Sequence, residues 1–333
     1  DAMRTVGRRV ISLVAVVLGL PLLVLLTPIA IPIAVLIDLL TGLRRLPTAR
    51  LWFFAVAFLA HEWLSQIAAA ALWLSGSFGR SLNHSHHRVV QGWWTDSLLR
   101  WARRLLGLRL DLDDLNKIPA GEIVVVSRHA SMVDALLPAH LFAQNLGRSC
   151  HYVLKKELRW LPSIDVFGHR LGNHFVDRAG NREKEIADIA RLTSTAQPGS
   201  AMVIFPEGTY ATPEAKERIQ ASLVRRNDSR AAALNQELLV LLPPRPAGTL
   251  ALFAERPSAP VVIVGHVGLE GIAKLSGLRR NLPATSPIVV RWWVTERAQI
   301  ADNLRWLDQQ WRLLDGWVHE QLHELGVTEE NSV

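Results

Sequence analysis

A histidine and an aspartate five positions apart, His129 and Asp134, could do acid–base chemistry together. An imidazole is a good proton acceptor when a carboxylate bonds one ring nitrogen and the other nitrogen stays free. On one continuous helix the two side chains would lie about 140° apart and could not meet. If His129 lies in a turn and a helix begins near Ser131, the carboxylate can fold back to the imidazole. Ser131 followed by Asp134 is also typical of a helix cap, so both interpretations stay open.

A second block of polar residues, 205–209 (FPEGT), follows a predicted strand. Proline and glycine favour a turn there, and ligands of parallel α/β sheets gather beyond the carboxyl ends of strands. Backbone N–H groups of such a turn can hold an anion, while Glu207 and Thr209 can bond a polyol. The segments 155–158 (KKEL) and 175–178 (FVDR) also place cations after predicted strands, where a phosphate could dock.

These blocks lie in a region where short β-branched runs alternate with helical patterns, which predicts an α/β domain with a largely parallel sheet. The predicted strands are 123–126, 152–154, 174–176, 201–205, 238–242, 261–264 and 288–294, and the clearest helices between them are 181–194 and 213–225. A last helix is indicated by apolar residues that advance by threes and fours from Ile300 to Leu325.

The first third of the chain is basic and apolar. Residues 1–110 contain twelve arginines, no lysine and four acidic residues, whereas the remainder is almost neutral. Two apolar stretches, 10–37 and 51–78, are each long enough to cross a bilayer. The partner of this segment is therefore expected to be a membrane rather than nucleic acid. We favour a hairpin of two crossing helices with both ends in the cytoplasm, and a hairpin lying in one leaflet is the alternative.

The expected organisation follows from these patterns. It consists of an N-terminal tail (1–9), a membrane hairpin (10–80), a basic interfacial linker with an amphipathic helix (81–114), a catalytic α/β domain (115–299) and a C-terminal amphipathic helix (300–326). With 333 residues, 49% of them hydrophobic and 20% charged, the chain is not disordered. The bacterial inner membrane, with the catalytic domain on its cytoplasmic side, is the expected location.

Three other features have a structural interpretation that competes with a functional one. Glu62 interrupts the second apolar stretch, and we expect it to surface or to pair with an arginine. The histidines at 84, 86 and 87 could bind zinc, but a solvated basic turn is favoured because no second group of ligands accompanies them. Cys150, the single cysteine, suits a reducing compartment and is expected to be buried.

The order of the blocks resembles that of the glycerolipid acyltransferases, typified by 1-acyl-sn-glycerol-3-phosphate acyltransferase. His129 and Asp134 match the His-x4-Asp motif of that family, 155–158 with 175–178 are similar to its second block, 205–209 matches its third, and 259–265 (APVVIVG) is similar to its fourth. The resemblance covers roughly residues 115–270. The stretch after Thr209 is similar to longer members that include lysophosphatidylinositol and lysocardiolipin acyltransferases.

The resemblance implies acyl transfer from a thioester, either acyl-CoA or acyl carrier protein, to the hydroxyl of a lysophospholipid, most simply lysophosphatidic acid. It implies that His129 is the general base and that Asp134 orients it, with no metal and no further cofactor. Residues implied in substrate binding are Glu207, Gly208 and Thr209 for the acceptor glycerol, with Lys156, Arg178 and Arg245 for its phosphate.

Two positions depart from the family pattern. Arg128 stands where the family usually has asparagine, and Tyr210 stands where an arginine usually follows the Glu-Gly-Thr turn. Tyrosine cannot make the bidentate phosphate contact that arginine makes. Recognition of the phosphate therefore shifts to Lys156, Arg178 and Arg245, or the acceptor is another lysophospholipid. A metal-dependent lipid phosphodiesterase and a non-catalytic lipid-binding protein are the alternatives from other classes.

Overall fold

The computed structural model describes residues 2–76, 84–131, 133–176, 198–272 and 275–326, and within 177–197 it describes residues 183, 186, 187, 189, 193 and 196. At its centre lies a seven-stranded sheet in the order β1-β7-β6-β2-β5-β3-β4. Every neighbouring pair is parallel except β6 and β7, which are antiparallel. The strands are β1 (Leu110–Leu112), β2 (Ile123–Ser127), β3 (Cys150–Lys155), β4 (His174–Val176), β5 (Ala201–Ile204), β6 (Val261–Val267) and β7 (Ile288–Thr295). The predicted α/β fold with a largely parallel sheet is confirmed.

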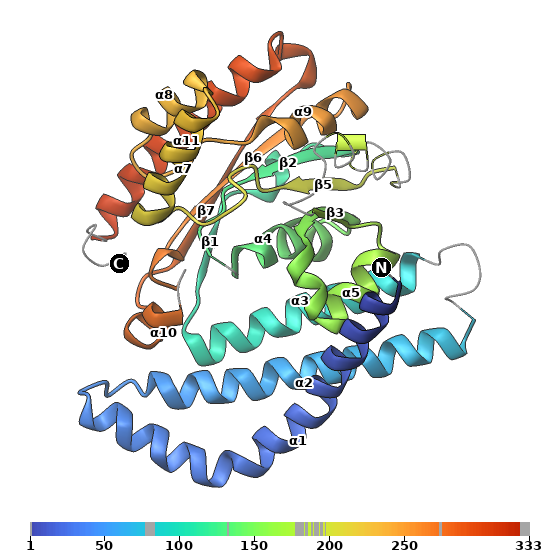
Figure 1. The fold of residues 1–333 in the computed structure, drawn as a ribbon, viewed down its shortest axis with the longest axis vertical. Helices are drawn as coiled ribbons and strands as arrows, with labels where there is room; N and C mark the ends of the chain where they lie inside the picture. Colours follow the sequence, from blue (N-terminus) through green and yellow to red (C-terminus); the bar gives the residue numbers. More distant parts are fainter. Residues whose placement is uncertain are drawn as a thin grey trace.

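Both faces of the sheet are covered, as the continuous apolar strands require. Along β2, Ile123 and Val125 pack on one face, and Val124 and Val126 pack on the other. The first face is covered by α3 (His84–Leu106), α4 (Leu136–Pro138) and the π-helical turn η3 (Ala139–Asn145), and the second by α9 (Pro246–Glu255) and α11 (Asn303–Glu324). Figure 1 shows α3 between the sheet and two long helices, α1 (Ala2–Leu40) and α2 (Pro47–Leu74).

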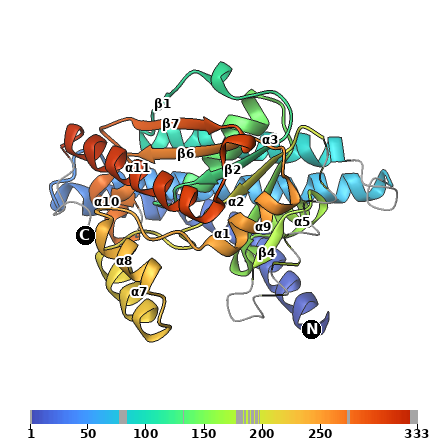
Figure 2. The ribbon, with the colours of Figure 1, turned by 90° about the horizontal axis from the view of Figure 1, so that it is seen from above.

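The remaining described helices are shorter or stand apart. Figure 2 shows α7 (Pro213–Arg225) and α8 (Ser229–Glu237) projecting together from the rest of the molecule. The others are α5 (Pro162–Arg170), α10 (Leu275–Asn281) and the 3-10 turns η1 (Leu115–Lys117), η2 (Val133–Ala135), η4 (Lys156–Trp160), η5 (Glu270–Ile272) and η6 (Arg297–Gln299).

The predicted pair of N-terminal helices is present, but α1 starts earlier than expected. Segment 1–9 was predicted as a tail, yet α1 begins at Ala2. The guanidinium of Arg8 and that of Arg9 lie 2.9 and 2.6 Å from the carboxylate of Asp165 in α5, which holds this first part of the helix in place. Helix α1 continues through Pro21, Pro28 and Pro32 and is bent (Figure 1), as prolines inside a helix require.

One predicted strand is wrong. Segment 238–242 contains three buried leucines, but its backbone forms no strand. The carboxylate of Asp315 in α11 accepts the N–H groups of Leu239, Val240 and Leu241 at 2.7–2.9 Å, so these donors are not available to a sheet. An apolar run alone does not distinguish the two arrangements.

Two further outcomes concern the ends of the predicted catalytic domain. Strand β1 lies in the segment assigned to the linker, and it pairs with β7 at the edge of the sheet. The C-terminal helix is confirmed as α11, whose Trp311, Leu314 and Val318 belong to the core beneath the sheet. Segment 213–225 is helical as predicted, and most of the helix predicted at 181–194 lies outside the described residues.

Candidate active site

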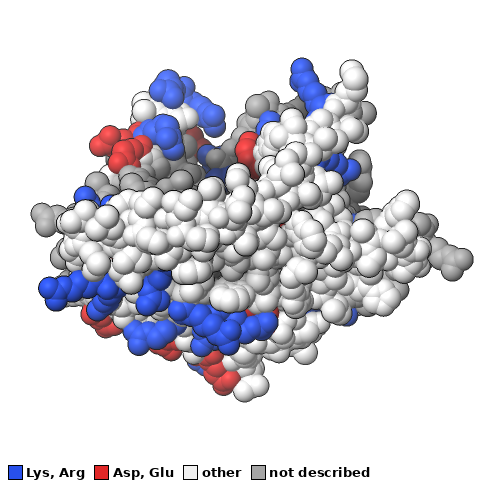
Figure 3. Space-filling model, turned by 90° about the horizontal axis from the view of Figure 1, so that it is seen from below, with Lys and Arg blue, Asp and Glu red and all other residues white. Residues whose placement is uncertain are grey.

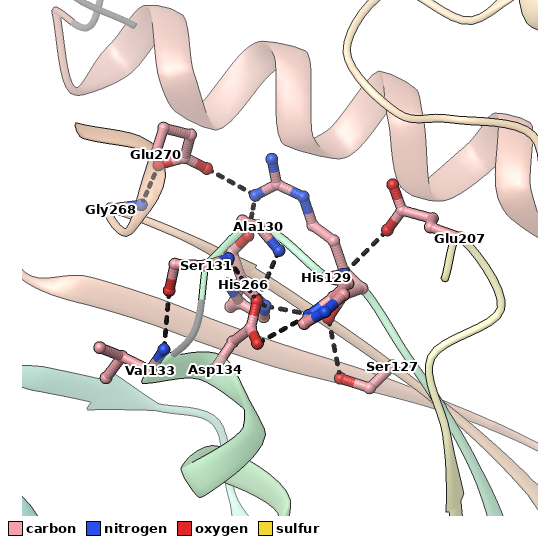
Figure 4. A network of polar contacts seen from close by, with 11 residues as sticks. Ser127, His129, Ala130, Ser131, Val133, Asp134, Glu207, His266, Gly268 and Glu270 are labelled. Atoms are coloured by element: carbon pink, nitrogen blue, oxygen red, sulfur yellow. Dashed lines mark hydrogen bonds and ion pairs between the residues drawn. The ribbon is translucent and has the colours of Figure 1, made fainter. Parts of the chain in front are cut away.

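His129 lies in the turn directly after β2, and a 3-10 turn that contains Asp134 follows it. His129 Nδ1 is 2.9 Å from Asp134 Oδ1 (Figure 4). Asp134 is fully buried, whereas the His129 side chain is 11% exposed. Because Nδ1 is bonded to the carboxylate, Nε2 is the nitrogen that can accept a proton from a substrate. The prediction that the carboxylate folds back to the imidazole is confirmed.

The second oxygen of Asp134 holds the same turn from within. Asp134 Oδ2 accepts the backbone N–H groups of Ala130, at 2.5 Å, and Ser131, at 2.7 Å. The alternative interpretation, a cap, is therefore also correct, because one carboxylate satisfies the donors of the turn and orients the imidazole. Two short bonds to fixed backbone donors leave Asp134 little freedom to rotate.

Glu207, at the carboxyl end of β5, braces this turn from the other side. Its Oε1 accepts the backbone N–H of His129 at 2.8 Å (Figure 4). Its Oε2 accepts the backbone N–H of Leu242 at 3.2 Å. Burial raises the pKa of Glu207 to about 7, against the opposing effect of Arg128. Both carboxylate oxygens thus accept backbone N–H groups, so Glu207 supports the turn that carries His129.

The turn that carries Glu207 also shapes the surroundings of the imidazole. Gly208 has a φ of +69°, a backbone conformation that favours glycine. The rings of Phe205 and Tyr210 lie 4.9 and 4.5 Å from the His129 ring, measured between centroids. Lys155 Nζ lies 5.3 Å from the Tyr210 centroid. Tyr210 therefore packs against the histidine itself, at the position where the family usually has arginine.

A cavity of about 1020 Å³ adjoins His129. Its wall contains Tyr210, which packs on the imidazole, Lys155, which lies over Tyr210, and Arg245, together with apolar side chains of the helices below the sheet. Phe54 and Phe58 from α2 and Trp94 and Leu98 from α3 belong to that apolar part. The space next to the histidine thus extends between the sheet and helices α2 and α3, and it can receive a molecule with a polar end and a hydrocarbon chain.

The other predicted binding residues are distributed unevenly. Three of them line the cavity, namely Glu207, Gly208 and Arg245. Two others do not: Lys156 begins the 3-10 turn η4, and Thr209 is half-buried. Arg178 lies outside the described residues. Within the predicted block 155–158, the residue that lines the cavity is Lys155, the last residue of β3.

The sequence singled out Arg128 only as a departure from the family pattern, and it gave no role to Glu270 or His266, which also lie near the dyad of His129 and Asp134. Arg128 is buried, and its Nη1 lies 2.6 Å from Glu270 Oε1. His266 in β6 is also buried, with Nε2 3.6 Å from Asp134 Oδ2. The usable signal was a histidine within an apolar strand, followed by an acidic residue in the next turn.

Two other candidate sites from the sequence have simple outcomes. Cys150 is buried as expected, and burial raises the pKa of its thiol to about 12. Among the residues that the structure describes, no three His, Cys, Asp or Glu side chains come together as a metal site. His87 is buried against Phe167, so it is not part of a solvated turn.

Comparisons with known proteins agree with this arrangement. Residues 109–263 match the model of the Acyltransferase family. The chain is 28% identical, over 174 residues, to 1-acyl-sn-glycerol-3-phosphate acyltransferase epsilon of Mus musculus, a match that covers 51% of this chain and 46% of that protein. The chain thus spans about half the length of this curated relative.

A solved structure is also similar. It is the 1-acyl-sn-glycerophosphate (LPA) acyltransferase PlsC of Thermotoga maritima, at 16% identity and a TM-score of 0.47, with 83% of this chain and 98% of that chain covered. The family match runs from β1 into the first half of β6 and includes His129, Asp134 and the turn of Glu207. Residues 109–263 are thus similar to the acyltransferase family, and the predicted resemblance to the glycerolipid acyltransferases is confirmed.

Proposed function

We propose that the protein transfers a fatty acyl group from a thioester, acyl-CoA or acyl carrier protein, to the free hydroxyl of a lysophospholipid, and that lysophosphatidic acid is the acceptor. The observation that carries the proposal is the 2.9 Å contact of His129 with buried Asp134 at the wall of a large cavity. The name of the mouse relative supports the choice of acceptor.

In this reaction His129 Nε2 takes the proton of the acceptor hydroxyl as its oxygen attacks the thioester carbonyl carbon. Asp134 stabilises the imidazolium that forms. When the tetrahedral intermediate collapses, the carbon–sulfur bond breaks, and the departing thiolate takes the proton from Nε2. The new ester and the free thiol account for all atoms. General-base assistance of this kind contributes about 10²–10⁴ in rate.

The cavity supports both substrates of the proposed reaction. Its apolar part, between α2, α3 and the sheet, suits an acyl chain, and its polar part lies beside the imidazole. Lys155 and Arg245 line the cavity, and we propose them as cations for the acceptor phosphate, with Lys156 and Arg178 as further candidates from the sequence. Since Tyr210 replaces the family's arginine, lysophosphatidylinositol or a lysocardiolipin is the second choice of acceptor.

The hairpin of α1 and α2 is proposed to bind the membrane that contains the lysophospholipid acceptor. Met3–Leu40 and Pro47–Leu74 are long and apolar enough to span a bilayer. Figure 3 shows a broad face without charged side chains, bordered by lysines and arginines. Apolar side chains exposed on α1 include Leu18, Leu25 and Ile29.

The contacts of the hairpin support the in-plane alternative over a crossing one. One end of α1 is tied to α5 through Arg8, Arg9 and Asp165. At its other end Asp38 lies 3.6 Å from the guanidinium of Arg279 in α10. Because both ends of α1 bind the same domain, the hairpin is proposed to lie in one leaflet, with the bacterial inner membrane and its cytoplasmic side as the location.

The test combines donors, acceptors and a variant. The purified chain, in vesicles, is given labelled acyl-CoA or acyl carrier protein with lysophosphatidic acid, lysophosphatidylinositol or lysocardiolipin, with and without chelator. We expect label in phosphatidic acid, no effect of chelator, and loss of at least about 99% of turnover in His129→Ala. Preference for another lysolipid would replace the acceptor, while chelator sensitivity or full turnover by His129→Ala would overturn the mechanism.

A further inference from the structure

His266 of β6 lies next to the dyad of His129 and Asp134, and the proposed reaction gives it no role. Strand β6 runs parallel to β2 with Ser127 opposite Val264, and the N–H of Arg128 donates to the carbonyl of Val264 at 3.0 Å. His266 therefore lies two positions further, beside the turn that carries His129. It is fully buried, and it does not line the cavity.

The imidazole of His266 is directed at the far side of Asp134 (Figure 4). Its Nε2 lies 3.6 Å from Asp134 Oδ2 and 3.2 Å from the carbonyl oxygen of Arg128. Oδ2 is the oxygen that also accepts the N–H groups of Ala130 and Ser131. His266 thus stands on the opposite side of the carboxylate from the bond to His129.

The surroundings of His266 fix its tautomer. A carbonyl oxygen can only accept, so the 3.2 Å contact with Arg128 requires a proton on Nε2. Nδ1 is buried and has no hydrogen-bond partner within the described part of the chain, which suits an unprotonated nitrogen better than a donor. Burial lowers the pKa of His266, which keeps the ring neutral. In a neutral ring, the Nε2–H that is bonded to the carbonyl of Arg128 also turns its positive end toward Asp134 Oδ2, 3.6 Å from Nε2, without adding a net charge.

Arg128 and Glu270 hold His266 in this place. Arg128 Nη1 donates to the carbonyl of His266 and to Glu270 Oε1, while Glu270 Oε2 accepts the N–H of Gly268 at 2.7 Å. The side chain of Arg128 thus donates to the backbone carbonyl of His266, and the side chain of His266 donates to the backbone carbonyl of Arg128. Although burial opposes it, the guanidinium of Arg128 lowers the pKa of Glu270, so the ion pair persists in the interior.

We propose that His266 is a positioning residue: its Nε2–H, bonded to the carbonyl of Arg128, faces Asp134 Oδ2 at 3.6 Å and holds that carboxylate against His129 by electrostatic attraction, and the buried ion pair of Arg128 and Glu270 locks His266 there. The inference rests on the proposed general-base role of His129. It also gives a role to Arg128, which stands where the family usually has asparagine. The side chain of Arg128 bonds His266 in β6 and Glu270 in η5, and it does not line the cavity. Figure 4 shows the dyad, Glu270 and Gly268 in one connected network.

The test compares two substitutions of His266, one without a hydrogen-bond donor and one with a donor. His266→Phe keeps an aromatic ring of similar size without a donor, whereas His266→Gln keeps a donor. With lysophosphatidic acid and acyl-CoA, we expect His266→Phe to lower kcat about 10- to 100-fold with KM for both substrates within twofold, and His266→Gln to stay within about threefold of the parent. The control is His151→Phe, a buried histidine of β3, which should leave kcat unchanged.

A second readout does not depend on turnover. In protein with ¹⁵N-labelled histidine, we expect His129 to hold its proton on Nδ1 in the parent and in His266→Gln, and to become a mixture of tautomers in His266→Phe. Unchanged kcat and tautomer in His266→Phe would overturn the inference, and so would equal losses of kcat in the Phe and Gln variants. Failure of the proposed function looks different, because the parent would then transfer no acyl group or His129→Ala would keep its activity.

Discussion

Asp134 and Asp165 are both buried aspartates, yet their partners differ in kind. The hydrogen bonds of Asp134 go to His129, Ala130 and Ser131, all within five positions along the chain, and its contact with the distant His266 is longer, at 3.6 Å. The shortest contacts of Asp165 are those with Arg8 and Arg9, more than 150 positions away, and its contact with His169 in its own helix is longer, at 3.5 Å. The first carboxylate fixes a few atoms within one turn, which suits a reaction. The second fixes where one helix lies on another, which suits an anchor.

Glu62 and Asp38 extend the second pattern. Glu62 in α2 accepts hydrogen bonds from the backbone N–H and the hydroxyl of Ser163 in α5. Asp38 at the end of α1 accepts the N–H and hydroxyl of Thr48 at 2.9 and 2.5 Å. The polar contacts of the hairpin therefore face the domain or close its own loop, and its outer surface is left to apolar side chains. A substitution at each kind of carboxylate should separate the two roles.

The largest effect is expected at the local carboxylate. In Asp134→Asn the new amide would donate toward Nδ1 of His129 and favour the wrong tautomer, since a donor cannot accept the Nδ1 proton. We expect kcat/KM to fall by about 10²–10⁴ while binding to vesicles is unchanged. Acyl transfer and vesicle sedimentation measure the two properties on one preparation. Parallel loss of both would mean that the two regions are not separable.

A substitution on the outer face of the hairpin should do the reverse of Asp134→Asn: it should weaken binding to vesicles and leave turnover unchanged. Leu25→Glu places a charge on α1 at a leucine that is 74% exposed, and we expect vesicle binding to weaken about tenfold or more. The matched control is Leu313→Glu on α11, an exposed leucine outside the hairpin. Turnover of substrates in detergent should stay within about twofold for both variants. Equal sedimentation of the two variants would remove α1 from the membrane-binding surface.

The distant carboxylate should affect stability more than chemistry. Asp165→Asn removes the partner of Arg8 and Arg9, and breaking a buried ion pair on one side leaves its charge unpaired. We expect a loss of about 2 kcal/mol or more and faster proteolysis at the N-terminal end of α1, with kcat within about threefold. Asp111→Asn, whose pair with Arg291 is half exposed, is the control and should change little. Proteolysis that is equally slow in both would argue against the anchor.

An effect on stability that depends on pH is expected at Glu207. Its pKa is raised by burial to about 7 in the folded chain, against 4.5 as its ordinary value. As pH rises from 4.5 to 7, the unfolded chain loses this proton and the folded chain keeps it, so the contribution of Glu207 to stability falls. Glu207→Gln lacks that titration, and the gap in stability should therefore shift in its favour by on the order of 3 kcal/mol across this window. Melting curves in detergent from pH 4 to 8 measure it, and a gap independent of pH would contradict the raised pKa.

The comparison of carboxylates also shows how far the sequence could lead. The pair of His129 and Asp134, the strands around it and the cap at Ser131 depend on residues close in the chain, and local spacing predicted them. Segment 238–242 was predicted as a strand because its apolar run was visible, whereas its partner Asp315 lies more than 70 positions away. The same holds for the contact of Glu62 with Ser163 and for that of His266 with Asp134, since only the tertiary fold brings these residues together.

Cys150 is where we expect the smallest effect. A thioester donor could in principle pass its acyl group to a thiol, and Cys150 begins the strand β3 that leads to the cavity. Its Sγ, however, is buried 3.8 Å from the carbonyl of Pro138, and burial raises its pKa to about 12, so almost no thiolate exists at neutral pH. We therefore expect Cys150→Ala to keep kcat within about twofold, and iodoacetamide to leave the native parent active. An acyl group trapped on Cys150 in rapidly quenched protein would instead move the chemistry away from His129, and with it the role of Asp134.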